Sequence, residues 1–136
     1  MYFLSLICPS NAALDGVTRA IFQGKQTVNF DNLSQARRKE VRLAAQKAVA
    51  TAQAAAAGLD SPPLDWPKDV QKPIDGVVTD LLDTVTYYQR YDNARTGAQF
   101  ATIYNSPTKE GVANAQKVRL RLGLPPAGKG CPKAST

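Results

Sequence analysis

Apolar residues recur every three to four positions along most of the chain, which is the spacing of one buried face of an α-helix. Four segments show this pattern, and no segment alternates apolar and polar residues as a half-buried strand does. The pattern predicts an all-α protein, folded as an antiparallel four-helix bundle. The length of 136 residues fits a single helical domain over residues 1–136.

The first segment has one apolar stripe and is expected to end near Gly24, which suits a helix terminus. Pro9 leaves two alternatives open. It either begins the helix in its first turn, with Cys8 as the cap, or lies inside a longer, kinked helix. The stripe consists of Leu4, Ile7, Leu14, Val17 and Ile21.

The second segment, "NLSQARRKEVRLAAQKAVATAQAAAAGL", is the most regular. Asn32 or Ser34 can cap its start, and Gly58 is a plausible stop. Its alanines are strong helix formers, and their small side chains let neighbouring helices approach closely. The stripe consists of Val41, Ala45, Ala48, Ala52, Ala55 and Leu59.

The third segment follows a proline-rich connector, "LDSPPLDWPKD". Pro67 suits the first helical turn, and Trp66 is expected to pack back as a hydrophobic staple. Pro73 must lie within the opening turn or kink the helix, and the segment frays by "NARTG". Its stripe consists of Val70, Ile74, Val77, Leu81, Val85 and Tyr88.

The last part of the chain contains one ambiguous stretch and one clear helix. Residues 97–105 fit either a short helix or a packed loop. The next segment reads as a helix capped by Ser106, with Pro107 in its first turn and with Gly123 and Pro125 at its end.

The two cysteines stand near opposite ends of the chain. Cys131 lies in a Gly- and Lys-rich stretch with little around it to bury a thiol, where a free cysteine would be exposed and oxidisable. A disulfide between Cys8 and Cys131 accounts for both positions and predicts an oxidising, extracytoplasmic compartment. Two unrelated buried thiols are the alternative.

The opening stretch "MYFLSLI" lacks the basic start of a secretion signal. Ile7 precedes Cys8 where a lipid-attachment site requires Gly or Ala, so we read Cys8 as part of the fold. No run of 18 apolar residues is present to span a membrane. Membrane anchoring is expected only through a segment that precedes this chain.

The chain contains no histidine, which excludes Ser-His and Cys-His nucleophiles and His-ligated metals. Carboxylates remain on the third segment, where they fit a solvated helix face better than an acid–base pair. We therefore expect no cofactor, no metal and no enzyme activity, with a carboxylate-dependent hydrolase as the rival. These acids are Asp69, Asp75, Asp80 and Asp83.

The net charge of +6 raises the question of a polyanionic partner. The stretch "QARRKEVR" places four basic residues at a helix start, which suggests nucleic-acid binding. A solvated helix face is the simpler interpretation, because no known reading motif accompanies the cluster. Its members are Arg37, Arg38, Lys39 and Arg42.

A second basic group lies at the end of the last helix, in "KVRLRLGLPP". Lys117 and Arg121 share one stripe, with Arg119 to the side. Cations near a helix C-terminus are favoured by the helix dipole alone. The alternative is a docking site for an acidic envelope protein or an anionic envelope polymer.

Four tyrosines stand close together in the sequence: Tyr87, Tyr88, Tyr91 and Tyr104. Helix spacing places Tyr88 inside, with Tyr87 or Tyr91 at its edge. The cluster fits either core packing with a polar rim or the wall of a ligand groove between helices.

Three stretches, "CPSNAAL", "LDSPPLDWP" and "VRLRLGLPP" before the final cysteine, resemble the mature part of small lipoproteins encoded in actinobacterial genomes. That family has no established biochemical activity, so the resemblance implies a location and a fold and carries over no catalytic residue. It implies that the lipid-bearing cysteine lies upstream of this region. We therefore expect a secreted or lipid-anchored envelope module that binds a partner or serves a structural role.

Overall fold

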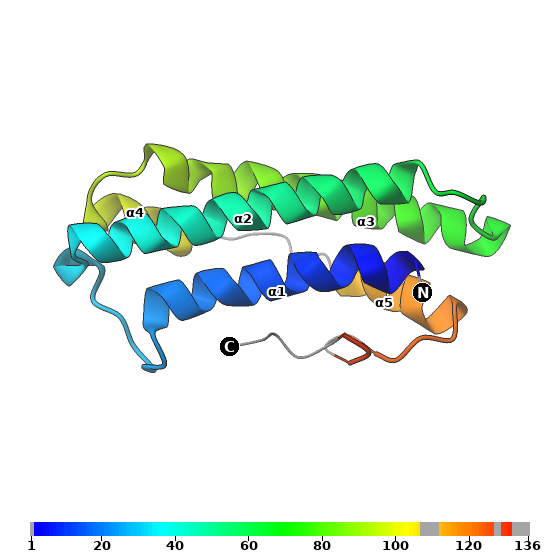
Figure 1. Cartoon of the computed structure of the whole chain (residues 1–136), viewed down its shortest axis with the longest axis horizontal. Helices are drawn as coiled ribbons and strands as arrows, with labels where there is room; N and C mark the ends of the chain where they lie inside the picture. The colour runs from blue at the N-terminus through cyan, green and yellow to red at the C-terminus, as the bar shows by residue number, and fades with distance from the viewer. Residues whose placement is uncertain (1, 107–111, 127–128, 132–136) are drawn as a thin grey trace.

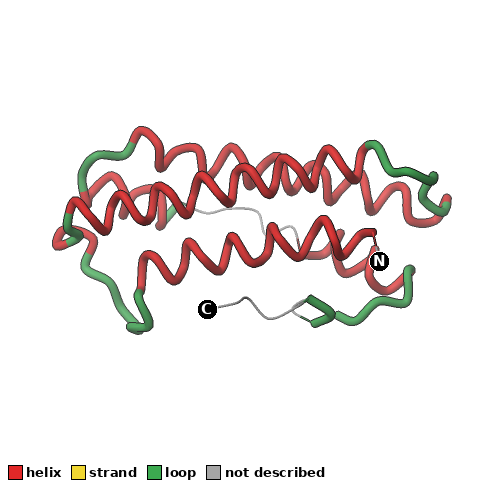
Figure 2. Tube along the Cα trace, viewed as in Figure 1, coloured by secondary structure: helices red, strands yellow, loops and turns green. Residues whose placement is uncertain are grey.

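Three long helices form the body of the molecule in the computed structural model, which describes residues 2–106, 112–126 and 129–131. Helices α1 (Tyr2–Phe22), α2 (Gln35–Asp60) and α3 (Lys68–Gln89) run in alternating directions, and α2 packs against both others (Figure 1). The described residues contain no strand (Figure 2), which confirms the predicted all-α class.

Two short helices lie at opposite ends of this body (Figure 1). Helix α4 (Gly97–Tyr104) packs against two 3₁₀ turns, η1 (Phe30–Asn32) and η2 (Arg90–Asn93). Helix α5 (Val112–Arg121) packs against α3. The ambiguous stretch before the last helix is thus helical, and the described residues form five α-helices where the sequence predicted four.

The core consists of two apolar clusters, one toward each end of the long helices. The first contains Phe3, Ile7, Ala52, Ala55, Ala56, Leu59, Val70, Ile74, Val77, Leu81, Val85 and Val118. The second contains Ala13, Val17, Ile21, Leu33, Val41, Ala45, Ala48, Tyr91, Ala94, Phe100 and Ile103. Every residue of the predicted α2 stripe is buried, so that prediction is confirmed.

The boundaries of α2 differ in part from the prediction. Of the two expected caps, Ser34 fills the role, and its hydroxyl accepts a hydrogen bond from the Arg37 N–H at 3.1 Å. Gly58 does not end the helix. A Cβ there would lie 2.7 Å from Leu6, and the Tyr2 hydroxyl donates to the Gly58 carbonyl at 2.7 Å. The glycine therefore allows α1 to approach α2 closely.

Both helix-interior prolines are accommodated. Pro9 lies inside α1, so the longer helix was the correct alternative. Pro73 lies beyond the opening turn of α3 and provides no N–H for the carbonyl of Asp69, four residues earlier. The guanidinium of Arg121 on α5 donates to that carbonyl instead. The missing backbone bond is thus replaced by a contact that holds α5 on α3.

The connector between α2 and α3 closes back onto the body. Pro67 is the N-cap of α3, one position before the expected first turn. Trp66 packs back as predicted: its indole N–H donates to the Leu59 carbonyl at 3.0 Å, and its ring lies 5.9 Å from that of Tyr2. No helix within the described ranges is both long and apolar enough to cross a membrane.

The ends of α4 and α5 give mixed outcomes. The Ser106 hydroxyl donates back to the Thr102 carbonyl at 2.8 Å, and the residues that a cap at Ser106 would contact lie outside the described residues. Pro107 lies outside the described residues. The predicted end of α5 is confirmed, since Gly123 adopts a φ of +70° and the Leu124 N–H donates to the Arg119 carbonyl at 2.8 Å.

Candidate functional site

A cluster of aromatic rings closes one end of the molecule, where α3 gives way to η2. Tyr87 and Tyr88 meet edge to face at 4.9 Å, and Tyr91 packs on Phe100 of α4 at 5.5 Å. Tyr91 is fully buried, whereas Tyr88 is only half-buried. The prediction that Tyr88 would be the innermost ring is wrong, because the chain tightens into a 3₁₀ turn at Arg90.

Burial changes the acid–base chemistry of these rings. Loss of solvent around each hydroxyl raises the pKa of Tyr87, Tyr88 and Tyr91 above the ordinary value of a tyrosine. The Tyr87 hydroxyl also donates to the Ile103 carbonyl at 2.8 Å. The rings are therefore neutral at physiological pH and join α3 to α4.

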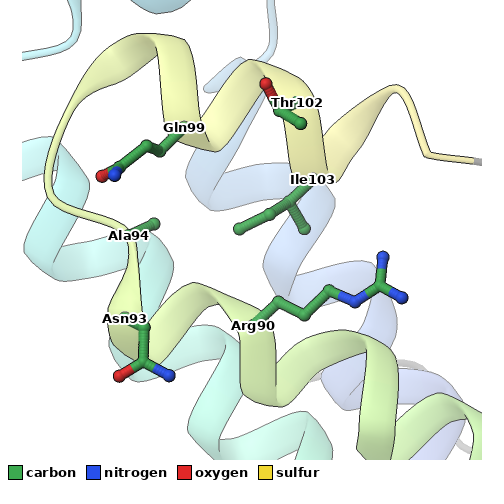
Figure 3. Close-up of a pocket in the computed structure, with 6 residues that line it drawn as sticks. All are labelled: Arg90, Asn93, Ala94, Gln99, Thr102 and Ile103. Carbon is green, nitrogen blue, oxygen red and sulfur yellow. The ribbon is translucent and has the colours of Figure 1, made fainter.

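A hollow of about 360 Å³ lies beside this cluster, between η2 and α4 (Figure 3). The side chains of Gln99 and Ile103 extend from α4 toward the turn that carries Ala94. Its apolar part is buried and its polar part is exposed to solvent. The lining consists of Arg90, Asn93, Ala94, Gln99, Thr102 and Ile103.

The geometry of the hollow is set by a capping box at the start of α4. The Thr96 hydroxyl accepts from the Gln99 N–H at 3.2 Å. The Gln99 side-chain oxygen accepts from the N–H groups of Arg95 and Thr96, at 2.6 and 3.1 Å. This fixes the amide orientation and leaves its NH₂ group as a donor. The spacing of Thr96 and Gln99 is a capping-box signal in the sequence.

The surroundings of the hollow are cationic. Arg90 lies at the rim and stacks on the Tyr87 ring, with its guanidinium carbon 5.9 Å from the ring centre. Arg42 of α2 donates to the Ala94 carbonyl at 3.3 Å. The Asp92 carboxylate accepts from Gln46 of α2 at 3.0 Å and does not line the hollow.

The acids of α3 are spread along the helix rather than gathered. Asp75 accepts a hydrogen bond from Gln71 at 2.8 Å, and Asp80 accepts one from Asn114 of α5 at 3.1 Å. Asp69 and Asp83 are exposed. In the part of the chain that the structure describes, no three potential metal ligands form a group.

Three members of the basic cluster on α2 contact the protein's own backbone. Arg37 donates to the Ile21 carbonyl at the end of α1 at 2.5 Å. Arg38 donates to the Leu33 carbonyl at 2.8 Å, and Arg42 reaches Ala94 as described above. All three side chains are half-buried. The cluster therefore joins α2 to its neighbours, and Lys39 is the one member of the four that is exposed.

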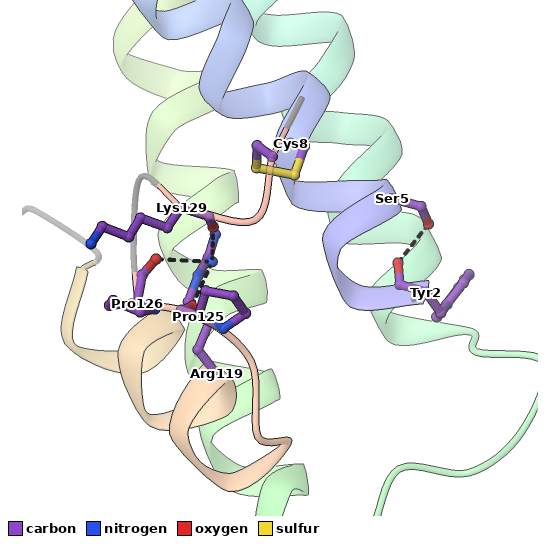
Figure 4. Close-up of a disulfide and its surroundings, with 8 residues drawn as sticks. Tyr2, Ser5, Cys8, Arg119, Pro125, Pro126 and Lys129 are labelled. Carbon is purple, nitrogen blue, oxygen red and sulfur yellow. Dashed lines mark hydrogen bonds between the residues drawn. A yellow bond between two sulfur atoms is a disulfide. The ribbon is translucent and has the colours of Figure 1, made fainter. Parts of the chain in front are cut away.

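The other end of the molecule carries the disulfide (Figure 4). Cys8 on α1 bonds to Cys131, with 2.00 Å between the sulfurs and 5.4 Å between the Cα atoms. The bond joins positions 123 residues apart, and no cysteine is free. The predicted pairing is present.

Arg119 organises the segment that leads to Cys131 (Figure 4). Its side chain is only 1 % exposed, and one guanidinium nitrogen, Nη1, lies 3.0, 3.3 and 3.0 Å from the carbonyl oxygens of Pro125, Pro126 and Lys129. Burial lowers its pKa, but an arginine keeps its charge. Nε and Nη2 are buried, with no hydrogen-bond partner among the residues that the structure describes.

The three cations predicted as a docking group do not act together. Arg119 is buried, so the prediction that it contributes to a surface site is wrong. Arg121 is exposed and contacts the Asp69 carbonyl, and Lys117 is exposed. The burial of Arg119 could not be predicted from the helical pattern, because it depends on the segment after α5 folding back over this helix.

No family model, curated protein or solved structure matches this chain. Its function is therefore inferred from the contacts, burial and charges described above. Two places stand out: the end closed by the disulfide, and the hollow between η2 and α4.

Proposed function

We propose that the protein is a non-catalytic module of the extracytoplasmic cell envelope, where it binds a partner or serves a structural role. The observation that carries this proposal is the pairing of both cysteines across nearly the whole chain. Structural disulfides persist in oxidising compartments and are rare in the cytosol. The module is secreted, or is lipid-anchored through a segment outside this chain.

We infer that the architecture is a four-helix bundle whose fourth helix is divided. Helix α5 supplies Val118 to the core cluster around Phe3. Helix α4 supplies Phe100 and Ile103 to the cluster at the other end. Together the two short helices cover the apolar surface that one long helix would cover.

Binding has more support than catalysis. The acids of α3 are separated along one helix, and Asp75 and Asp80 are bonded to amide side chains. A carboxylate-dependent hydrolase needs two acids that converge in a concave site. Among the described residues, the lining of the hollow contains one cation and two amides but no carboxylate.

For the partner, we propose an acidic envelope protein or an anionic envelope polymer at the exposed Lys117 and Arg121. Nucleic acid has less support, because Arg37, Arg38 and Arg42 are engaged with backbone carbonyls. The variant Lys117→Glu, which leaves the Arg121–Asp69 contact intact, is expected to weaken binding to envelope extract at low salt, whereas Lys39→Glu keeps it. Equal binding by both variants would remove this surface from the proposal.

The compartment is tested by trapping thiols with acid in cells that produce the protein naturally, followed by alkylation under denaturing conditions. We expect no free cysteine and recovery of the protein in the envelope or secreted fraction. Two alkylated cysteines in a cytosolic fraction would contradict the proposed location.

A further inference from the structure

We propose that the hollow between η2 and α4 is a binding site for a small amphipathic carboxylate. The inference rests on the proposed function, since it names a ligand class for a binding module. It is carried by the juxtaposition of a buried apolar floor, one cation at the rim and the Gln99 amide with its free donor capacity.

The floor of the hollow is apolar and firmly held. Ala94 and Ile103 are 3 % and 8 % exposed, and both belong to the core cluster that contains Tyr91. The backbone around them is tied down on both sides, by Arg42 at the Ala94 carbonyl and by Tyr87 at the Ile103 carbonyl. A short hydrocarbon group placed here meets a preformed surface and leaves water.

The rim of the hollow is suited to an anion. The Arg90 side chain stacks on the Tyr87 ring and makes no hydrogen bond or ion pair within the described part of the chain, so its guanidinium N–H groups can serve a ligand. A guanidinium can bind a carboxylate through two parallel hydrogen bonds. The Gln99 NH₂ group adds a neutral donor, whereas the Asn93 amide points away from α4 (Figure 3).

The charged residues that the structure describes around the hollow favour an anionic ligand over a cationic one. Asp92, the nearest acid in the sequence, accepts from Gln46 on the α2 side. Arg95 is held in the same turn, where it donates to the carbonyls of Asp92 and Ala94 at 2.6 and 3.0 Å. With Arg42 behind Ala94, the turn presents net positive charge.

The size of the hollow limits the ligand. A volume of about 360 Å³ is at the low end of the roughly 300–1,000 Å³ range of small-molecule sites. A free short-chain acid fits this description, and so does the carboxyl terminus of a peptide with an apolar last residue. The two sources share one chemistry, a carboxylate beside a small apolar group.

The experiment is an amide-shift titration of the disulfide-bonded protein, with hexanoate as the free acid and N-acetyl-leucine as the peptide terminus. We expect saturable shifts at Gln99, Asn93 and the backbone around Ala94 for at least one acid, and the tighter acid identifies the source. Hexanamide and hexylammonium at the same concentration should shift these signals at least about tenfold less. Equal shifts with hexanamide, or none with either acid, would overturn the proposal.

The variant Arg90→Gln tests the cation directly. Because the Arg90 side chain is exposed and makes no hydrogen bond in the described residues, the fold should be unaffected. Affinity for the acid should fall about fivefold to tenfold. Arg19→Gln is the matched control, an exposed arginine of α1 outside the lining. Unchanged affinity in Arg90→Gln, or an equal loss in Arg19→Gln, would rule out the proposed site. Neither result would bear on the thiol-trapping test of location.

Discussion

Several backbone carbonyls that lack their usual N–H donor accept a hydrogen bond from an arginine side chain instead. Arg37 reaches the last turn of α1, and Arg121 reaches the Asp69 carbonyl that Pro73 leaves free. Arg119 gathers carbonyls of the segment before Cys131. A guanidinium suits this work because it carries five donors in a rigid plane. Basic residues therefore hold the fold together here as well as setting its charge.

The closeness of Arg119 to the disulfide gives the first prediction. In Arg119→Gln the segment from Pro125 to Lys129 loses its charged donor, so Cys131 is held less firmly beside Cys8. One hydrogen bond to a charged group contributes about 1.5–3 kcal/mol, so the equilibrium constant for disulfide formation against glutathione should fall by about tenfold or more. Quantifying oxidised and reduced protein across glutathione ratios measures this.

Arg121→Gln is the control for that experiment. It removes a neighbouring arginine of the same helix whose partner is Asp69 rather than the terminal segment. Thermal stability is a poor readout, because Arg119 also buries two unpaired nitrogens and its loss removes that cost. An equal shift of the redox equilibrium in both variants would argue against a specific role for Arg119.

The buried tyrosines give a second prediction, for alkaline pH. Their pKa values are raised in the folded state, so above about pH 10 the unfolded chain releases protons that the folded chain retains. The free energy of unfolding is therefore not reduced by these tyrosines at neutral pH, and it falls as the pH rises above about 10. Urea unfolding from about pH 8 to about pH 11 should show the loss. Tyr91→Phe should reduce it, and an unchanged slope would refute the assignment.

Among the helices and turns, the sequence predicted the structure best where one periodic apolar stripe determines which helix face is buried. The α2 stripe from Val41 to Leu59 is buried throughout, because alanine repeats at helical spacing leave one face for the neighbours. The prediction failed where the path or contact of another part of the chain determines the local structure. Gly58 looked like a helix end, but α1 crosses there. Tyr91 looked peripheral, but the tightening at η2 turned it inward.

Gly97, at the start of α4, supplies the third prediction. A Cβ there would lie 2.0 Å from the Phe30 carbonyl oxygen, and this backbone atom of η1 cannot move away as a side chain would. Gly97→Ala should therefore lower the free energy of unfolding by about 3 kcal/mol or more, with loss of the hollow. Chemical denaturation of the oxidised protein measures the change.

Gly16→Ala is the matched comparison inside α1. A Cβ at Gly16 would have a guanidinium nitrogen of Arg19 as its nearest neighbour, at 3.8 Å, which is an ordinary contact. Alanine is the better helix former, so this variant should gain about 0.5–1 kcal/mol. Opposite signs at the two glycines would support the close packing of α4 on η1, and similar effects would contradict it.

The whole molecule depends on a bond between distant positions. In the chain-entropy view, joining residues 123 apart stabilises the fold by roughly 4–5 kcal/mol. The fourth prediction is that Cys8→Ser/Cys131→Ser loses about that amount. Reduced wild-type protein should match it in denaturant titrations. Identical unfolding curves with and without reductant would contradict the prediction.

The disulfide could be predicted from the sequence, whereas the hollow between η2 and α4 could not. The disulfide could be predicted because Cys131 lies among glycines and lysines that cannot bury a thiol, and Cys8 is its one available partner. The hollow needs η2 and α4 to meet, and residues such as Arg90 and Gln99 show nothing in sequence that marks them as neighbours. Arg119 is similar, since only the folded path from Pro125 to Cys131 encloses it.

The disulfide also determines how the protein responds to a mechanical pull. Tension that enters before Cys8 and leaves after Cys131 passes through the first turns of α1 and then through the sulfur–sulfur bond, so the part of the helical body between the two cysteines is bypassed. The 123 residues spanned by the bond hold roughly 400 Å of contour length at about 3.3–3.6 Å per residue. Under load the oxidised protein therefore extends little, whereas reduction of the disulfide lets the spanned chain unfold and extend.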